Sequence, residues 1–418
     1  MIIHKAFYNF ISSLYDWELR KLSEGTYIKS RIGWQRLTKD EYLFAGDYYL
    51  ITGTDIDELT HSIDLSRSVY VSKERYEKDE KIQVKEGDII ITKDGTIGKV
   101  AMVQGLDKPA TLNSHLFVLR DISGELDNRF LLHVLDSPLF TKFVEATKTG
   151  STLTGLPQKT FVNFMYYLPS KEEQQRISEL LDRLDAILAL HQRKLDLLKQ
   201  LKQAYLQKMF PKNGEKMPEM RFAHFKEEWT QYKLSELATH RGGTAIEKYF
   251  SDSGEYKVIS IGSYGLDNKY VDQGIRAVSN KITNKRLVKK NELTMVLNDK
   301  TANGSIIGRC LIIDSNNRFV INQRTEIISP QENFDPSFAY TILNGPFREN
   351  IKKVVQGGTQ IYINYSVVEN LSLSVPSIKE QEKIGELFKQ FDNIITLHQK
   401  KFRALKTIKE AFLSKFFI

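Results

Sequence analysis

The chain has 418 residues, a length that suits about two to four domains. It contains no long apolar stretch, so we expect no membrane span. Its first residues include acidic and polar side chains where a signal peptide needs an apolar core, so we expect no signal peptide. The single cysteine, Cys310, excludes an internal disulfide framework and a zinc site built from several thiolates. It suits a reducing compartment, and we expect a cytoplasmic protein.

Basic residues outnumber acidic ones, and the formal net charge is +8. An excess of this size favours a polyanionic partner such as nucleic acid, because Lys and Arg side chains neutralise phosphates. The alternative is that the charge serves only solubility.

Residues 1–168 form the first predicted module, a mixed α/β globule. Alternating apolar runs such as "DIIITKDG" and "GKVAMV" predict short strands broken by glycine turns. The turn Gly95–Lys99 resembles a phosphate-binding loop in outline. Lys93 stands where that motif needs glycine, however, and Val100 stands where it needs Ser or Thr. We therefore interpret the segment as a tight turn between strands.

The sequence pattern predicts the first long helix over residues 169–212. The opening Pro-Ser-x-x-Glu is a capping box, in which the Ser170 hydroxyl accepts from a backbone amide and Glu173 reaches back to the cap. More than thirty residues follow without a proline, so the helix should be roughly 50 Å long at 1.5 Å per residue. Helices of this length in soluble proteins are usually coiled coils.

Residues 213–375 predict a linker and a second module that faintly repeats the first. "WELRKLSE" from Trp17 matches "WTQYKLSE" from Trp229, and "TKDGTIGKVAMV" resembles "NDKTANGSIIGRCLII". The linker element "RFAHF" has no clear counterpart before Trp17, so the start of the first module is less well defined. The two modules share a scaffold but differ in content.

Residues 376–418 repeat the first long helix without gaps, at a spacing of 207 residues. About half of the aligned positions are identical, including the capping box formed here by Ser377 and Glu380. Repeats of this kind decide architecture. Two variable modules joined by a constant helical spacer suit a protein that reads two different features at a fixed distance.

Both helices carry an apolar heptad seam, which predicts that they pair with each other as an antiparallel coiled coil. Each seam is interrupted by one histidine and one lysine at matching positions, and polar seam residues usually set the register. Metal binding by His191 and His398 is the alternative, and we expect no metal site. The seam positions are Ile177, Leu181, Leu184, Leu188, His191, Leu195, Leu198, Lys202, Tyr205 and Met209, and Ile384, Phe388, Phe391, Ile395, His398, Phe402, Leu405, Lys409, Phe412 and Phe416.

The sequence shows no catalytic motif. It contains neither a Pro-Pro nor a Pro-Asp dipeptide, which argues against an amino-methyltransferase core and weakens a nuclease interpretation. The common metalloprotease and serine-hydrolase motifs are absent too. We expect a non-catalytic chain that binds no cofactor itself.

Polar, glycine-rich loops remain as candidate binding segments, because their side chains are those that contact phosphates and base edges. For any single residue, an ordinary solvated loop is the alternative. The expected phosphate contacts are Lys93, Lys99, Lys159, Arg241, Lys300 and Arg309. The expected base contacts are Ser151, Thr152, Thr359 and Gln360, and Thr96 is a further expected DNA contact.

Taken together, these features resemble the specificity subunit of type I restriction–modification systems. The most specific parts are "LPSKEEQQRI" and "VPSIKEQEKI" at the starts of the two helices, and the linker "FPKNGEKMPEMRFAHFKEEWTQYKLSEL". The resemblance covers essentially the whole chain.

The resemblance implies an α+β chain of two pseudo-repeated target-recognition domains separated by the long helices. Each domain would read one half of a split double-stranded DNA sequence. Two methyltransferase subunits would bind S-adenosylmethionine and methylate adenine, and restriction subunits would use ATP and Mg²⁺ for translocation and cleavage.

A second apolar stripe on each helix lies off the seam and is the expected docking surface for the methyltransferase subunits. The alternative is that the modules fold back over it. The stripe residues are Leu180, Ile187, Leu190 and Leu201, and Leu387, Ile394, Leu397 and Ile408.

Two other functions remain open. One is a coiled-coil scaffold whose modules bind proteins without DNA specificity, and the other is an unrecognised nuclease. DNA binding that falls steeply with salt favours the specificity subunit, because phosphate neutralisation releases counterions.

Overall fold

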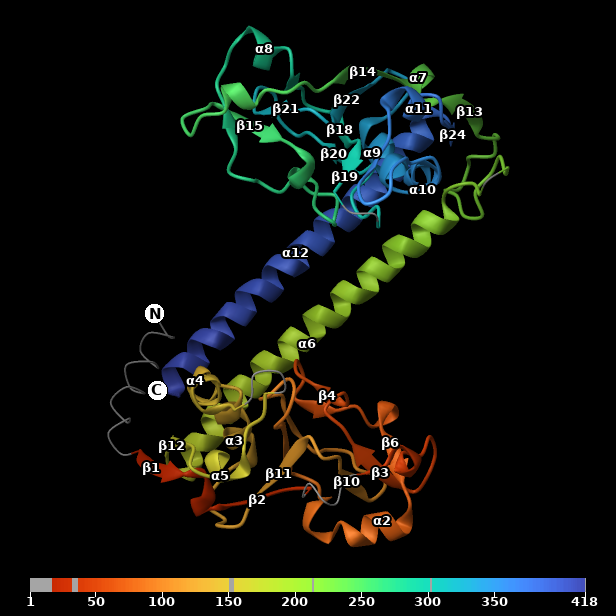
Figure 1. Ribbon diagram of the computed structural model, residues 1–418. Helices are drawn as coiled ribbons and strands as arrows, with labels where there is room; N and C mark the ends of the chain where they lie inside the picture. The colour runs from red at the N-terminus through yellow and green to blue at the C-terminus, as the bar shows by residue number, and fades with distance from the viewer. Residues whose placement is uncertain (1–16, 32–36, 150–153, 213, 301–302, 418) are drawn as a thin grey trace. The chain divides into compact units, whose positions relative to one another are not determined.

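The computed structural model describes residues 17–31, 37–149, 154–212, 214–300 and 303–417 (Figure 1). The chain divides into two compact units. The first unit comprises Met1–Lys194 together with His398–Ile418, and the second comprises Leu195–Leu397. Each unit therefore contains one module and a part of each long helix, which differs from the linear division expected from the sequence.

The first module contains two four-stranded sheets. One is antiparallel, with the order β2-β11-β8-β9, and the other has the order β6-β3-β10-β7, in which β3 and β10 are parallel. The strands of the first sheet are β2 (Thr26–Ser30), β11 (Leu116–Asp121), β8 (Ile89–Thr92) and β9 (Val100–Met102). Those of the other sheet are β6 (Val69–Val71), β3 (Tyr48–Ile51), β10 (Ala110–Leu112) and β7 (Gln83–Val84).

The second module repeats both sheets. Its strand orders are β14-β22-β18-β20 and β16-β15-β21-β17, and again the two central strands of the second sheet, β15 and β21, are parallel. The strands of the first sheet are β14 (Ala238–Gly242), β22 (Thr325–Pro330), β18 (Leu293–Val296) and β20 (Cys310–Ile312). Those of the other sheet are β16 (Arg276–Ala277), β15 (Tyr256–Ile259), β21 (Phe319–Ile321) and β17 (Leu287–Val288). The faint sequence repeat thus corresponds to one topology used twice.

The central strands are apolar because both of their faces are covered. All four residues of β8, "IIIT", and of β18, "LTMV", are buried. Such continuous apolar runs are typical of strands buried on both faces. The turn that follows β8 is the predicted tight turn, since Gly95 and Gly98 have φ values of 74° and 94° that favour glycine.

Helices cover the sheets of each module. Asp127 caps α3 (Asn128–Leu135), because its side chain accepts from the amide of Arg129 at 2.8 Å. Asp335 caps the equivalent helix of the second module by accepting from the amide of Phe338 at 2.8 Å. The helices are α2 (Lys73–Lys78), α3 (Asn128–Leu135), α4 (Pro138–Thr147) and α5 (Gln158–Phe161), and α7 (Leu234–Leu237), α8 (Lys281–Asn284), α9 (Pro336–Asn344), α10 (Pro346–Lys353) and α11 (Tyr365–Val368).

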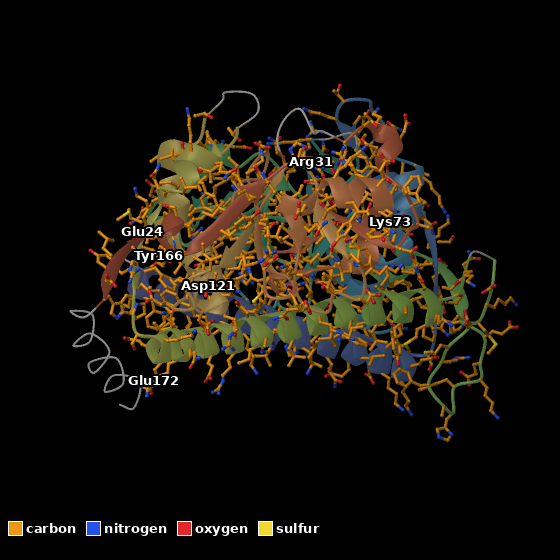
Figure 2. The ribbon with its side chains drawn as sticks, turned by 90° about the horizontal axis from the view of Figure 1, so that it is seen from below. Glu24, Arg31, Lys73, Asp121, Tyr166 and Glu172 are labelled. Atoms are coloured by element: carbon orange, nitrogen blue, oxygen red, sulfur yellow. The ribbon has the colours of Figure 1, made fainter. Side chains whose placement is uncertain are left out.

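A two-stranded clip closes each module where its long helix begins. In the first unit β1 (Glu18–Lys21) pairs with β12 (Met165–Leu168). In the second unit β13 (Thr230–Lys233) pairs with β24 (Ser372–Val375). Figure 2 shows Tyr166 of the first clip between Glu24 and Asp121, and burial raises the pKa of this tyrosine to about 12.

The long helices are α6 (Lys171–Lys208) and α12 (Ile378–Phe416). No residue of either predicted seam is exposed. In the first unit Asp185 of α6 lies 2.6 Å from Lys409 of α12, and in the second unit Lys202 of α6 lies 2.6 Å from Asp392 of α12. Because partner numbers fall along one helix as they rise along the other, the pairing is antiparallel, and the predicted coiled coil is confirmed.

The two seam histidines face each other. Nδ1 of His191 lies 2.9 Å from Nδ1 of His398, so one nitrogen donates and the other accepts. Burial, together with the charges of Lys194, His191 and Lys401, lowers the pKa of His398. A histidine pair in contact across the seam fits the predicted role in setting the register.

The capping boxes are only partly as predicted. The Ser170 hydroxyl accepts from the amide of Glu173 at 3.4 Å, as expected. The carboxylate of Glu380, however, accepts two hydrogen bonds of 2.7 Å from the Arg221 guanidinium. A bidentate, charge-assisted pair is stronger than one bond to a neutral amide. Arg221 belongs to the linker element "RFAHF".

The C-terminal end of each long helix completes the core of a module. In the first unit the ring of Phe417 lies 5.5 Å from that of Phe130, beside Leu413 and Phe416. In the second unit Phe210, which follows α6, lies 5.8 Å from Phe338. Burying one such side chain contributes about 1.5–3 kcal/mol. Each module is therefore held by the start of one helix and the end of the other.

Candidate nucleic-acid interface

Two of the expected binding loops of the first unit lie side by side. The amide of Leu156 donates to the carbonyl of Lys93 at 2.8 Å, and the amide of Gly95 donates to that of Thr154 at 3.2 Å. Residues 93–96 and 154–156, some sixty positions apart, thus form one cluster. We call them the first loop cluster.

The second unit builds its cluster in the same way. Strand β19 (Asn298–Asp299) pairs with β23 (Ile361–Tyr362), so two expected loops again lie together. Gly357 allows the tight turn before β23, because its φ is 102° and an added Cβ would lie 2.2 Å from the carbonyl oxygen of Gln360. We call residues 298–300 and 357–362 the second loop cluster.

Six expected DNA contacts belong to these clusters or to the helix beside them. Thr96, Lys159, Lys300, Thr359 and Gln360 are exposed. Lys93 is half-buried and forms an ion pair of 2.8 Å with Asp94. Ser151 and Thr152 lie outside the described residues.

Three expected phosphate contacts are engaged within the protein instead. Lys99 forms an ion pair of 2.5 Å with Glu58, and Arg241 one of 2.9 Å with Glu292. Arg309 donates to the side-chain oxygen of Asn268 and, at 2.8 Å, to the carbonyl of Ser305. Each charge already has a partner, so the structure brings none of the three into the loop clusters as a free cation.

Sequence reasoning missed His115 beside the first loop cluster. Its ring is exposed and lies 3.3 Å from Asp94, and its carbonyl accepts from the amide of Lys93 at 2.9 Å. His115 lies just before β11 and over twenty positions from Lys93, and the pairing of β11 with β8, which ends at Thr92, brings the two residues together. No local pattern could have shown this contact.

The expected docking stripe is largely exposed. Leu190 is 65% exposed and Leu397 is 51% exposed. The exception is Leu387, which is partly buried against the core of the second unit. Leu197 is a further exposed apolar residue that the sequence analysis did not single out. The other exposed stripe residues are Leu180, Ile187, Leu201, Ile394 and Ile408.

A family model described as the type I restriction modification DNA specificity domain matches residues 15–200 and again residues 226–407. The chain belongs to this family. Each match covers one module, its clip and most of the long helix that follows. The specificity domain therefore occurs twice, as the repeated strand orders and loop clusters indicate.

Similar curated proteins carry the same description. The chain is 24% identical over 350 residues to the type I restriction enzyme MjaVIII specificity subunit of Methanocaldococcus jannaschii, covering 80% of this chain and 79% of that one. It is 21% identical over 415 residues to the putative MjaX specificity subunit of the same organism, covering 96% and 92% of the two chains.

Solved structures share the fold. The S subunit of a type I restriction–modification system from M. genitalium matches with a TM-score of 0.65 at 17% identity, covering 96% of both chains. A structure titled for complex assembly and conformational transition of the type I R-M system matches with a TM-score of 0.53 at 15% identity. The α+β fold with two repeated domains and a long helix after each is therefore that of known specificity subunits.

The residues that the structure describes lack two features. None of their helices is apolar enough over a sufficient length to cross a membrane. Across the same ranges, His, Cys, Asp and Glu side chains nowhere gather in threes in a way that could hold a metal ion.

Proposed function

We propose that this chain gives a type I restriction–modification complex its DNA sequence specificity. Each unit reads one half of a bipartite duplex target through its loop cluster, and bound partner subunits methylate adenine or restrict the DNA. The chain itself is non-catalytic, and its DNA target places the complex in the cytoplasm.

One observation carries this proposal: the same scaffold occurs twice with different residues in its loop clusters. The first cluster offers Lys93 and Thr96, with His115 beside it, whereas the second offers Lys300, Thr359 and Gln360. Lys and Thr side chains contact phosphates, and Gln forms bidentate hydrogen bonds with adenine. A shared frame with unlike loops suits the recognition of two unlike half-sites.

The exposed stripe supports the proposal of protein partners. Contiguous apolar residues on a soluble helix mark an interaction surface. Matching stripes occur at equivalent positions along α6 and α12, as the binding of two equivalent methyltransferase subunits requires. S-adenosylmethionine would bind to those subunits, and ATP with Mg²⁺ to the restriction subunits.

Genome-wide mapping of methylated adenines tests the function directly. A host that carries this gene with its methyltransferase partner should methylate one bipartite sequence, and deletion of this gene alone should abolish that methylation. Unchanged methylation after the deletion would overturn the proposal.

Salt titration separates the proposal from a scaffold without DNA specificity. The assembled complex should bind duplex DNA with an affinity that falls steeply as salt rises, each phosphate contact contributing about 0.9 to the slope. The Lys300→Ala change should lower the slope by about one. The matched control is Lys199→Ala, because Lys199 is exposed on α6 outside both loop clusters. A complex that binds protein alone, regardless of salt, would favour the scaffold.

A further inference from the structure

In each unit one loop of the module reaches the helix pair of that unit. In the first unit it is the hairpin of β4 (Ile56–Asp57) and β5 (Ser62–Ile63). In the second unit it is the loop 265–270, closed by a bridge between Tyr264 and Tyr270. We call these the first and second positioning loops.

The two positioning loops are equivalent. Each has one non-glycine residue with left-handed backbone, His61 with φ of 49° in the first and Asn268 with φ of 61° in the second. These residues are separated by the same 207 positions as the long helices. Such backbone is uncommon outside glycine, and Asn and His adopt it more readily than most residues.

Each positioning loop is tied to the segment that carries the loop cluster. Lys99 ends the turn that bears Lys93 and Thr96, and it pairs with Glu58 at the tip of the first loop. Arg309 occupies the matching position before β20, and it donates to Asn268 of the second loop. A shift of either loop would therefore be transmitted to the segment proposed to contact DNA.

Charged side chains surround His61, at the end of the first positioning loop that faces the long helices. Nδ1 of His61 lies 3.2 Å from the carbonyl of Val100, which can only accept, so Nδ1 carries a proton. Nε2 lies 3.0 Å from Nζ of Lys409 on α12, and 3.2 Å from a carboxylate oxygen of Asp136. Asp185 of α6 is 3.6 Å from the same nitrogen.

The far end of the second loop contains no histidine. Lys269 donates to the hydroxyl of Thr396 on α12, and the carbonyl of Asn268 accepts from the Tyr340 hydroxyl at 2.9 Å. Neither contact involves a histidine, the side chain whose ordinary pKa lies near neutral pH. The two units therefore use one loop position with different chemistry.

Protonation of His61 changes the balance of positive and negative charge in a buried cluster. Around its ring lie Asp136 after α3, His133 in α3, Asp185 in α6 and Lys409 in α12. An open pocket of about 410 Å³ beside the ring adds Glu58, Lys99, Lys406 and Glu410. When the His61 imidazole is neutral, the carboxylates of Asp136 and Asp185 face one cation, Lys409. When His61 is protonated, they face two cations.

The charged form of His61 is favoured in the folded chain. Burial lowers the pKa of His61, but the hydrogen bond and charge of Asp136, with the charge of Asp185, outweigh burial and Lys409 and raise it. Although burial raises the pKa of Asp136, His61 and Lys409 lower it to about 2. The stabilisation from the charged histidine is complete below its ordinary pKa and is lost as the pH rises through the raised value.

We propose that the positioning loops align each loop cluster on its helix pair, and that His61 makes this alignment proton-sensitive in the first unit alone. His61 is thus a positioning residue for the first half-site. This inference rests on the proposed function, because it concerns how well each half-site is read.

The test compares the two half-sites within one complex. The chain is assembled with its methyltransferase subunits, and the probes are duplexes carrying the methylated sequence mapped in the host, intact or with either half scrambled. As the pH rises from the ordinary histidine pKa of about 6.5 through the raised pKa of His61, discrimination against a scrambled first half should fall about fivefold, a size typical of coupling between sites. Discrimination against a scrambled second half should not change.

His61→Asn is the decisive variant, because Asn tolerates the left-handed backbone and stands at this position in the second unit. It should remove the pH dependence and leave discrimination at the high-pH value, with thermal unfolding confirming the fold. The matched control is His224→Asn, an exposed histidine that also has left-handed backbone, with φ of 78°. This control should behave as the wild type does.

Two results would overturn the inference. One is an unchanged pH dependence in the His61→Asn variant, and the other is an equal pH dependence for both half-sites. If the wild-type complex shows no sequence-specific binding at any pH, the proposed function itself fails instead.

Discussion

Gln174 and Gln381 make the same three hydrogen bonds in the two units. The side-chain oxygen of Gln174 accepts from the amide of Asp127 at 2.8 Å, and its nitrogen donates to two carbonyls, those of Glu125 and Pro169. Gln381 bonds to Asp335, Asn333 and Pro376 in the same manner. Each glutamine thus joins the start of a long helix to the cap of a module helix.

Changing Gln381 to Ala should destabilise the second unit. The substitution removes three hydrogen bonds to backbone groups, of which the carbonyl of Pro376 is buried, and a buried group left unpaired costs about 1–3 kcal/mol. The denaturant midpoint, followed by circular dichroism, should fall clearly. Gln390→Ala is the control, because Gln390 bonds only to the exposed Glu386 of its own helix in the described residues, and it should leave the midpoint almost unchanged. Equal midpoints for the two variants would contradict this role of Gln381.

The paired helices offer a direct test of their register. His191 and His398 face each other, and Cys310 is buried with a pKa raised by burial, so it should not compete in oxidation. A chain with cysteines at 191 and 398 should form an internal crosslink readily, seen as altered gel mobility without reductant.

The control for this crosslink places the second cysteine at the neighbouring exposed Leu397 instead. Efficient crosslinking of the 191–397 pair, with none between 191 and 398, would show a different register.

Variants of the exposed apolar stripe test whether partner subunits dock there. Changing Leu190 and Leu397 to Asp places charge on the exposed apolar surface and should abolish co-purification with the methyltransferase, while circular dichroism stays unchanged. Leu188→Asp is a different kind of variant. Because Leu188 is buried in the seam, an Asp there should destabilise the folded chain. Retained assembly of the Leu190→Asp, Leu397→Asp double variant would move the docking surface elsewhere.

The helix pairing could be predicted because a heptad pattern is local and repeats along the chain. The residues that fix its register were harder to foresee. Lys202 and Lys409 stood out as polar breaks, but their partners Asp392 and Asp185 lie off the predicted seam and became evident only with the helices side by side. A one-dimensional pattern gives the face of a helix, not the charges that a neighbouring helix brings to it.

The candidate site was less predictable, because loops follow no period. Glycine-rich, basic stretches indicated the right segments, and backbone pairing joins them into two clusters. The same composition also drew attention to Lys99 and Arg309, whose charges are bound by the positioning loops. Whether a loop lysine faces solvent or a neighbouring acid depends on contacts between segments distant in sequence.

The repeated modules predict independent recognition of the two half-sites. Each unit has its own sheets, loop cluster and positioning loop, so replacing residues 1–165 with the equivalent module of a relative should change one half of the methylated sequence only. Methylation mapping checks this. The reciprocal exchange of residues 226–372 is the control and should change only the other half. An exchange that altered both halves together would contradict independent recognition.

The first unit consists of two separate segments of the chain, and this affects the order in which the two units fold during synthesis. Leu195–Leu397 is one continuous segment and can fold as soon as it has left the ribosome, whereas the first unit still lacks His398–Ile418. The core around Trp17 and Phe130 also needs Leu413, Phe416 and Phe417, which are made after the whole of the second unit. The first unit therefore depends on residues that are made after the second unit, and a released chain truncated after Leu397 should contain a protease-resistant second unit and a protease-sensitive first one.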